Sequence, residues 1–258
     1  MASSALALHH GLNSYRQAHT WLKQTHRLKW LIIPLILAIL LFPAYIYGVY
    51  GATTSSLAWL VNYFNWDDYS YGYWLSFPVV LVVVLFIGYI IIKNLIMLLC
   101  VPMNAYLADV MMDDLLGKPQ QETSLMQSIV RALVMTLFAI VIGLISTIIL
   151  IAIGFIPVAG AIISLVLGFF IQAFLAAWGF FDPVFERLHY PIRKSFWRCV
   201  RLMPQMQSQG LPFVLCFQIP ILGWAFAPTY GTLAGVYYAS QLHQQQKLLP
   251  PTPITGAS

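Results

Sequence analysis

The chain has 258 residues, of which 60% are hydrophobic and only 8% are charged. Soluble globular domains carry about a quarter of their residues as charged side chains, so this composition excludes an ordinary soluble protein. No polar stretch is long enough to form a separate soluble domain, and we expect one membrane domain over residues 1–241 and a disordered tail over 242–258. The net charge of +5 indicates contact with lipid rather than with nucleic acid.

Residues 1–30 contain four basic side chains and no acid, namely Arg16, Lys23, Arg27 and Lys29. This polar run interrupts any apolar core, so the segment is not a secretory signal. Residues 31–50 carry no charge and predict a first transmembrane helix. Pro34 and Pro43 are compatible with that helix, because neighbouring helices in a membrane can satisfy the carbonyls that proline frees.

From Gly51 to Leu75 the sequence is dense in Trp and Tyr, which is typical of a loop at the membrane–water boundary. A second transmembrane helix is predicted over residues 76–99. Pro102-Met103-Asn104 is expected to end this helix. A short surface helix should follow, with Asp109, Asp113 and Asp114 interspersed among apolar residues until Gly117 stops it.

Between Arg131 and Asp182 there is no Lys, Arg, Asp, Glu or His. Ile156-Pro157-Val158-Ala159-Gly160 divides this stretch into two apolar arms, which predicts a helical hairpin over residues 132–181. Each arm is long enough to cross a hydrocarbon core about 30 Å thick. Asp182-Pro183 is expected to end the second arm.

Downstream of the hairpin, Ile192, Phe196, Cys199 and Met203 recur at helical spacing. Four basic side chains occupy another part of the same predicted helix: Arg193, Lys194, Arg198 and Arg201. An amphipathic basic helix of this kind predicts contact with anionic lipid at the membrane surface. A role in collecting anionic solutes is the alternative.

A second hairpin is predicted over residues 211–240, with its turn at Ile219-Pro220-Ile221-Leu222-Gly223. Its first arm, Pro212 to Ile219, would be only about 12 Å long as a helix, so we expect this hairpin to be re-entrant. Both turns share the pattern Ile-Pro-x-x-Gly, and small residues follow each at four-residue spacing. That spacing lets helices pack closely in lipid, whether or not the two hairpins arose by duplication.

The positions of Lys and Arg predict the orientation. The 51–75 loop and both hairpin turns contain neither residue type, so the positive-inside rule places both termini on the cytoplasmic side. The predicted fold is therefore an all-α integral membrane protein. It has two long transmembrane helices, two helical hairpins that enter from the cytoplasmic side, at least the second being re-entrant, and interfacial amphipathic helices.

The sequence offers no catalytic, metal or cofactor chemistry. No acidic pair shares a helix face inside the predicted membrane segments, and His189 and His243 are isolated. Cys100, Cys199 and Cys216 have no metal-ligand spacing and are interpreted as reduced residues that fill space. We therefore predict that the protein is not an enzyme and holds no metal or cofactor.

The proline turns suggest a function. A proline just inside a helix start leaves backbone N–H groups and about half a positive charge at that end, which inside a membrane would attract an anion. The sequence thus predicts a channel or permease for a small inorganic anion, along seven residues: Arg27, Lys29, Asn104, Pro157, Gly160, Pro220 and Gly223. The alternative is a membrane scaffold or assembly factor that uses its hairpins to wedge one leaflet and its acidic 109–114 helix to bind a partner.

Short motifs over residues 11–240 add a family resemblance. They are Ile33-Pro34-Leu35, Pro102-Met103-Asn104 followed by Leu107-Ala108-Asp109, Phe155-Ile156-Pro157 with Gly160, Asp182 with a nearby proline, and Ile219-Pro220-Ile221-Leu222 leading to Pro228 and Gly235. In this order they resemble the CysZ-type sulfate permeases within the etoposide-induced-domain membrane family.

That resemblance implies sulfate uptake for cysteine synthesis by a homo-oligomer in a bacterial inner membrane. It also implies a Gly-x-Arg-Arg signature for sulfate binding just before the first span. Here the aligned residues are His26-Arg27-Leu28-Lys29, so the glycine is absent and Lys29 is the only aligned basic residue.

Overall fold

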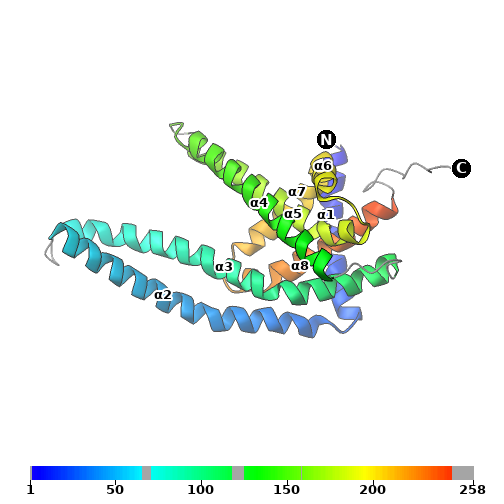
Figure 1. The fold of residues 1–258 in the computed structure, drawn as a ribbon, viewed down its shortest axis with the longest axis horizontal. Coiled ribbons are helices and arrows are strands. Elements are labelled where there is room, and N and C mark those ends of the chain that lie inside the picture. Colours follow the sequence, from blue (N-terminus) through cyan, green and yellow to red (C-terminus); the bar gives the residue numbers. More distant parts are fainter. Residues whose placement is uncertain (1, 66–70, 118–124, 158, 246–258) are drawn as a thin grey trace, which may run out of the picture.

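A computed structural model describes residues 2–65, 71–117, 125–157 and 159–245 of the chain. Within these ranges the elements are helical and no strand is present, which confirms the predicted all-α class (Figure 1). In chain order they are α1 (Ala2–Gln24), the short 3₁₀ helix η1 (Leu28–Leu31), α2 (Ile32–Phe64), α3 (Tyr71–Leu116), α4 (Leu125–Gly154), α5 (Gly160–Arg187), α6 (Ile192–Arg201), α7 (Met203–Phe217) and α8 (Leu222–Gln244).

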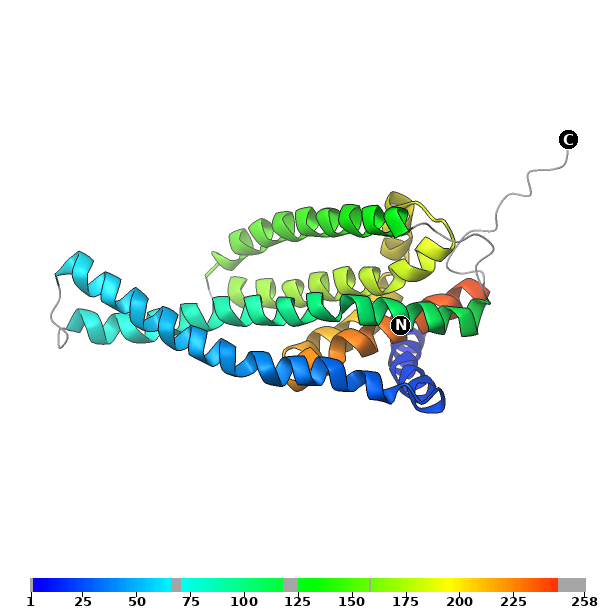
Figure 2. The same ribbon diagram turned by 60° about the horizontal axis from the view of Figure 1, so that its bottom comes forward.

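Two long helices, α2 and α3, form an antiparallel pair that projects beyond the rest of the molecule (Figures 1 and 2). They have 33 and 46 residues and are about 50 and 69 Å long. The predicted loop from Gly51 to Leu75 is therefore wrong over most of its length, because α2 continues to Phe64 and α3 begins at Tyr71. The aromatic residues lie instead on helix surfaces, where Trp59 and Tyr63 are largely exposed and stack on each other.

Prolines end fewer helices than the sequence suggested. The predicted break at Pro102 and the separate surface helix after it are wrong, since α3 passes through Pro102 to Leu116. Likewise α5 passes through Pro183 to Arg187, and α7 passes through Pro212. An interior proline costs a helix one hydrogen bond, and burial of the adjacent turns against other helices offsets that cost. Met103 and Leu107, just after Pro102, are buried in this way.

The two hairpins have their turns where the sequence predicted them. The first is formed by α4 and α5 and the second by α7 and α8. With 15 residues, α7 is longer than the 8-residue arm that the sequence predicted, at about 22 Å. The described part of the second hairpin ends at Gln245, and most of the predicted tail, residues 246–258, lies outside the described residues.

The N-terminal helix α1 was not predicted as an element. It lies across α7 and α8, with one face of small and apolar residues buried against them. That face consists of Gly11, Ser14, Ala18 and Leu22. Their spacing of three to four residues is the helical signal that sequence analysis could have used.

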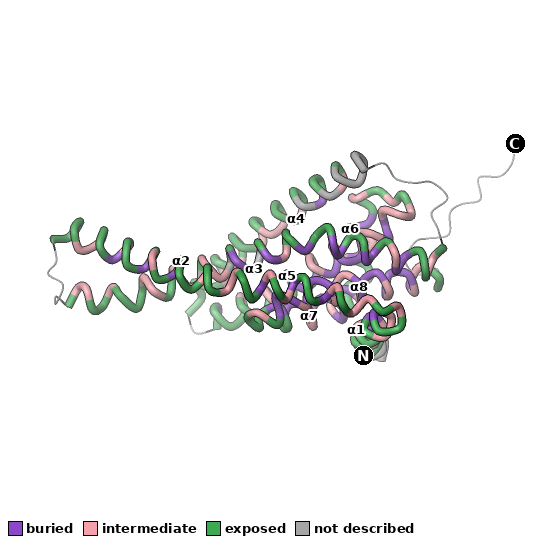
Figure 3. The backbone as a smooth tube through the Cα atoms, turned by 90° about the horizontal axis from the view of Figure 1, so that it is seen from below, coloured by how far each residue is buried: buried purple, intermediate pink, exposed green. Residues whose placement is uncertain are grey.

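Five segments among the described residues are long and apolar enough to cross a membrane. They are Leu28–Phe64, Tyr71–Tyr89, Leu95–Leu116, Leu133–Gly154 and Gly160–Arg187, and the second and third both belong to α3. Figure 3 shows long exposed stretches on α2, α3 and α4, and large apolar side chains supply much of that exposure. A surface of this kind is stable in lipid rather than in water.

Candidate functional site

The predicted site residues fall into two groups that the fold does not bring together. Arg27 and Lys29 lie at η1, where α1 joins α2. The two proline turns lie toward the middle of the long α2–α3 pair, away from η1 (Figure 2). Asn104 is on α3 between these levels. The interface of α3 and α8 runs from the level of Asn104 to the second proline turn, and we refer to it as the α3–α8 seam, comprising Tyr89, Asn104, Trp224 and Thr229. Tyr106 lies on another face of α3, toward Arg27 and Trp30.

At the η1 end, Arg27 is held by aromatic rings. Its guanidinium carbon lies 5.7 Å from the ring centre of Trp21 and 5.8 Å from that of Tyr106. One Nη also makes a long hydrogen bond of 3.5 Å to the Tyr106 hydroxyl. Cation–π contacts of this kind fix a guanidinium without neutralising it. Arg27 is therefore a positioned, half-buried charge, whereas Lys29 is exposed.

The residue before Arg27 has an unusual backbone conformation. His26 has a φ of 54°, in the left-handed region that favours glycine. It occupies the position where the resembling family carries glycine. His26 therefore adopts this conformation at a cost in backbone strain.

Within the α3–α8 seam, Asn104 and Thr229 form a buried polar pair. The Thr229 hydroxyl donates a 2.8 Å hydrogen bond to Oδ1 of Asn104, which links α3 to α8. Both side chains are less than 10% exposed. Asn104 was predicted from the sequence as part of the anion path, whereas Thr229 was not, because nothing in the sequence indicates which residue of α8 faces Asn104.

The two proline turns have the same backbone hydrogen bonds. In the first, Ala159 N–H donates to Pro157 and Gly160 N–H donates to Ile156. In the second, Leu222 N–H donates to Pro220 and Gly223 N–H donates to Ile219. The shared Ile-Pro-x-x-Gly pattern therefore encodes one repeated turn. These four backbone N–H groups already donate to carbonyl oxygens, so the turns offer an anion fewer donors than the sequence predicted.

The glycines of these turns are required by a close approach of the two arms. A Cβ atom at Gly160 would collide with the carbonyl oxygen of Ile153, and one at Gly223 would collide with that of Cys216. Both glycines are buried, whereas Pro157 and Pro220 are exposed. The glycines thus have a structural role in closing the hairpins.

The tip of the second hairpin is fastened to the long helices. Tyr89 of α3 donates a 2.7 Å hydrogen bond to Oε1 of Gln218, next to the turn. Trp224 is fully buried, with its ring centre 5.6 Å from that of Tyr89 and 6.5 Å from that of Tyr45 on α2. The indole N–H of Trp224 makes no hydrogen bond of normal geometry to a described residue. This buried donor lies close enough to the Tyr89 hydroxyl to interact with it.

Three helices hold the C-terminal end of α3. Trp21 of α1 donates a 2.9 Å hydrogen bond to Asp114. Arg187 of α5 pairs with Asp113 at 2.5 Å, and Gln244 of α8 donates to the Leu115 carbonyl at 3.2 Å. Two of the three acidic side chains that sequence analysis assigned to partner docking are therefore engaged within the chain.

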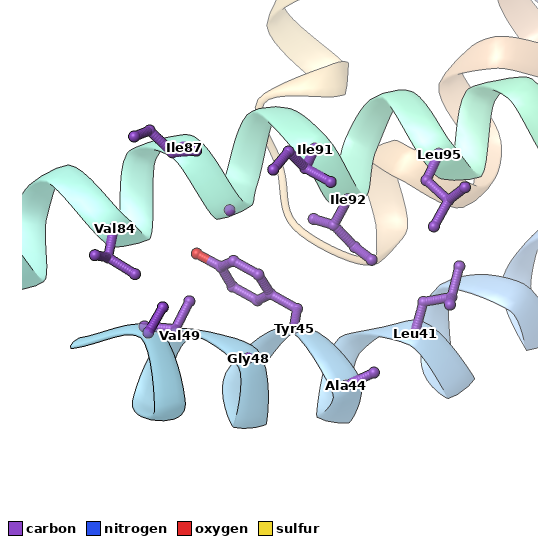
Figure 4. Close-up of a pocket in the computed structure, with 12 residues that line it drawn as sticks. Leu41, Ala44, Tyr45, Gly48, Val49, Val84, Ile87, Ile91, Ile92 and Leu95 are labelled. Carbon is purple, nitrogen blue, oxygen red and sulfur yellow. The ribbon is translucent and has the colours of Figure 1, made fainter. Parts of the chain in front are cut away.

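A cavity of about 520 Å³ is also present between α2 and α3 (Figure 4). Its lining is almost entirely apolar, and none of the seven predicted site residues contributes to it. Tyr45 reaches across it toward α3, and its hydroxyl donates to the Leu85 carbonyl at 3.1 Å. An apolar groove of this kind suits lipid or a neighbouring helix and offers nothing to an inorganic anion.

A family model described as "Sulfate transporter CysZ/Etoposide-induced protein 2.4" matches residues 14–228, which is most of the chain. The chain belongs to this family. The match includes both proline turns, Arg27 and Asn104 and ends one residue before Thr229. No relative of the chain was found among the curated proteins. Membership in this transporter-type family, together with the five apolar segments, makes the chain a multi-pass membrane protein.

Proposed function

We propose that the protein is a permease for a small inorganic anion, sulfate, in a bacterial inner membrane, where it supplies sulfur for cysteine synthesis. The family supports transport as the general function. The observation that supports an anion as substrate is the α3–α8 seam, because it contains the buried polar pair Asn104–Thr229 and ends at the buried indole of Trp224. Both termini lie on the cytoplasmic side in this proposal, and the protein acts as a homo-oligomer.

In this proposal Arg27 and Lys29 concentrate anions on the cytoplasmic side of the seam. Within the seam, Thr229 occupies Oδ1 of Asn104, which leaves the amide NH₂ group of Asn104 as a donor for an anion. The N–H of Trp224 serves the same purpose at the hairpin tip. α7 is about 22 Å long, which is shorter than a hydrocarbon core about 30 Å thick, and this supports a re-entrant second hairpin.

The seam is closed in this structure, since Asn104, Thr229 and Trp224 are all buried. Conduction therefore requires α8 to move relative to α3. The polar pair favours the closed position through a single hydrogen bond, which contributes only about 0.5–1.5 kcal/mol.

Sulfate flux into proteoliposomes tests the proposal. The wild-type protein should take up labelled sulfate faster than empty liposomes, and Asn104→Leu or Arg27→Gln should lower the initial rate severalfold. Arg16→Gln is the matched control for Arg27→Gln, because it removes an exposed charge on α1. Flux equal to that of empty liposomes, for sulfate and other small anions at several pH values, would reject the permease.

The scaffold alternative predicts a copurifying protein and no anion flux. The acidic segment 109–114 is poorly suited to bind a partner, because Asp113 and Asp114 already bind Arg187 and Trp21 of the same chain. Purification of the protein with an intact partner, together with absent flux, would favour this alternative.

A further inference from the structure

The helix α6, which connects the two hairpins, carries a basic outer face that the transport proposal does not use. Arg193, Trp197 and Arg201 recur every four residues and therefore lie on one side of the helix, with Lys194 beside them. All four are exposed, Trp197 by 56%. Arg198 lies half-buried at the edge of this face. No acidic residue occurs between residues 188 and 201.

The opposite face of α6 is covered by the protein itself. Ser195 and Cys199 are buried, and Phe196 packs against the rings of Trp178, Phe174 and Phe138 with centroid distances of 5.1, 5.7 and 6.0 Å. The apolar side of α6 is therefore turned toward the protein rather than toward lipid. The outer face of α6 therefore consists of basic side chains and one exposed tryptophan, Trp197.

The depth of α6 is set by its contacts. Phe138 and Trp178 lie within two turns of Arg131 and Asp182, the two charges that bound the uncharged hairpin. Arg131 also donates a 2.7 Å hydrogen bond to the Tyr190 carbonyl and so fixes the segment before α6 to α4. The helix is therefore held at the level of Arg131 and Asp182, where the uncharged stretch long enough to cross the hydrocarbon core begins and ends. This is the level of the lipid headgroups.

The first turn of α6 contains Arg193 and Lys194 and no acid, and Pro191 provides no side-chain cap. Cations at the N-terminus of a helix are unfavourable, because that end already carries partial positive charge. Lipid phosphates beside this turn would relieve the repulsion. An exposed tryptophan among basic residues is likewise a combination suited to the headgroup region.

We propose that the outer face of α6, formed by Arg193, Lys194, Trp197 and Arg201, binds the headgroups of anionic phospholipids in the cytoplasmic leaflet. Because α6 joins α5 to α7, lipid bound there also fixes the two hairpins relative to each other. This proposal is independent of the transported substrate and stands whether or not sulfate is carried.

Lipid-dependent thermal unfolding of the detergent-purified protein tests it. Phosphatidylglycerol and phosphatidylcholine with identical acyl chains are titrated into the wild type, Arg193→Gln/Lys194→Gln and the control Arg16→Gln/Lys23→Gln. A basic residue near an anionic surface is worth about 1 kcal/mol, or about fivefold in affinity, so the α6 variant should bind phosphatidylglycerol about 25-fold more weakly. The control, which removes two exposed charges from α1, should keep the wild-type response.

A second measurement locates the lipid directly. Phosphatidylglycerol with a headgroup spin label should quench part of the wild-type tryptophan emission, and Trp197→Phe should lose that part. Equal phosphatidylglycerol responses in the wild type and the α6 variant would overturn the proposal. So would a thermal shift with sulfate or inorganic phosphate that matches the one with phosphatidylglycerol and is lost in the α6 variant, because the face would then bind free anions rather than lipid.

Discussion

Arg131 of α4 and Asp182 of α5 form a bidentate ion pair at the open end of the first hairpin. The guanidinium donates through Nε to Oδ2 at 3.1 Å and through Nη2 to Oδ1 at 2.5 Å. Both side chains are largely buried, with 14% and 12% of their surfaces exposed. A third donor of Arg131 binds the Tyr190 carbonyl, so the pair also ties the hairpin to the segment leading into α6. The hairpin is thus closed by a salt bridge at one end and by a proline–glycine turn at the other.

We expect Arg131→Leu to destabilise the protein by about 3–5 kcal/mol, because it leaves the Asp182 carboxylate buried without its partner. The free energy of unfolding in mixed micelles measures this loss. Arg131→Leu/Asp182→Leu should recover much of it, since apolar replacement of both members removes the unpaired charge.

The second ion pair of the described chain provides the comparison. Asp113 is 43% exposed in its pair with Arg187, so Asp113→Asn should cost no more than about 1 kcal/mol. A loss on Arg131→Leu no larger than that on Asp113→Asn would contradict the buried role of the Arg131–Asp182 pair.

The turn glycines lead to a second prediction. Gly160→Ala and Gly223→Ala each place a methyl group against a backbone carbonyl, which cannot rotate away as a side chain could. We expect each to destabilise its hairpin by about 1–3 kcal/mol, as overpacked sites do. Unfolding measurements on the purified variants give the size of the effect.

Gly143→Ala is the matched control. Gly143 lies within α4, and a Cβ there would meet no atom within 4 Å. Alanine is the better helix former by about 1 kcal/mol, so this variant should be neutral or more stable. If all three alanine variants behave alike, the close approach at the turns has no energetic consequence.

Much of the first hairpin could be predicted from the sequence, including its closing ion pair. Arg131 and Asp182 lie at nearly equal separations on either side of Pro157, and they carry opposite charge. Two antiparallel arms folded at that proline must bring them together. The pairing itself was not predicted, because in the sequence both residues stand out only as the limits of an uncharged stretch.

Prolines were harder to interpret because their effect depends on tertiary contacts. Pro102, Pro183 and Pro212 lie inside helices, whereas Pro157 and Pro220 lie in turns. Only the two turn prolines have the full pattern Ile-Pro-x-x-Gly, in which the glycine approaches a carbonyl of the preceding helix. A glycine three residues later is not sufficient, since Pro228, inside α8, is also followed by Gly231. The partners of Asn104 and Arg27, by contrast, come from distant helices, and no local pattern indicates Thr229 or Tyr106.

The conformation of His26 supports a third prediction. A residue with a side chain in the left-handed region costs about 1–2 kcal/mol relative to glycine. His26→Gly should therefore raise the free energy of unfolding by about 1 kcal/mol, part of the gain being cancelled by the greater freedom of glycine in the unfolded chain. Sulfate flux should be unchanged, because Arg27 keeps its contacts with Trp21 and Tyr106. A loss of stability would show that the imidazole makes a favourable contact that outweighs the strain.

The depth of the second hairpin can be measured with the native cysteines. Cys100 and Cys199 are buried, and burial raises the pKa of the Cys199 thiol, so both should react slowly with maleimides. Cys216 is exposed and lies close to the Pro220 turn. We expect a membrane-permeant maleimide to label Cys216 in intact proteoliposomes. A charged maleimide should fail from either side and should succeed only after detergent is added.

Two variants make this result decisive. Cys216→Ala should abolish the labelling, which assigns the signal to Cys216. Tyr71→Cys in that background places a thiol at a 96% exposed position near the α2–α3 loop, and the charged reagent should reach it from the outside. A thiol at a hairpin tip inside the hydrocarbon core is inaccessible to a charged reagent, because the reagent would have to leave water. Labelling of Cys216 from the outside at the rate seen for Tyr71→Cys would mean that the second hairpin crosses the membrane completely, and the re-entrant arrangement would be wrong.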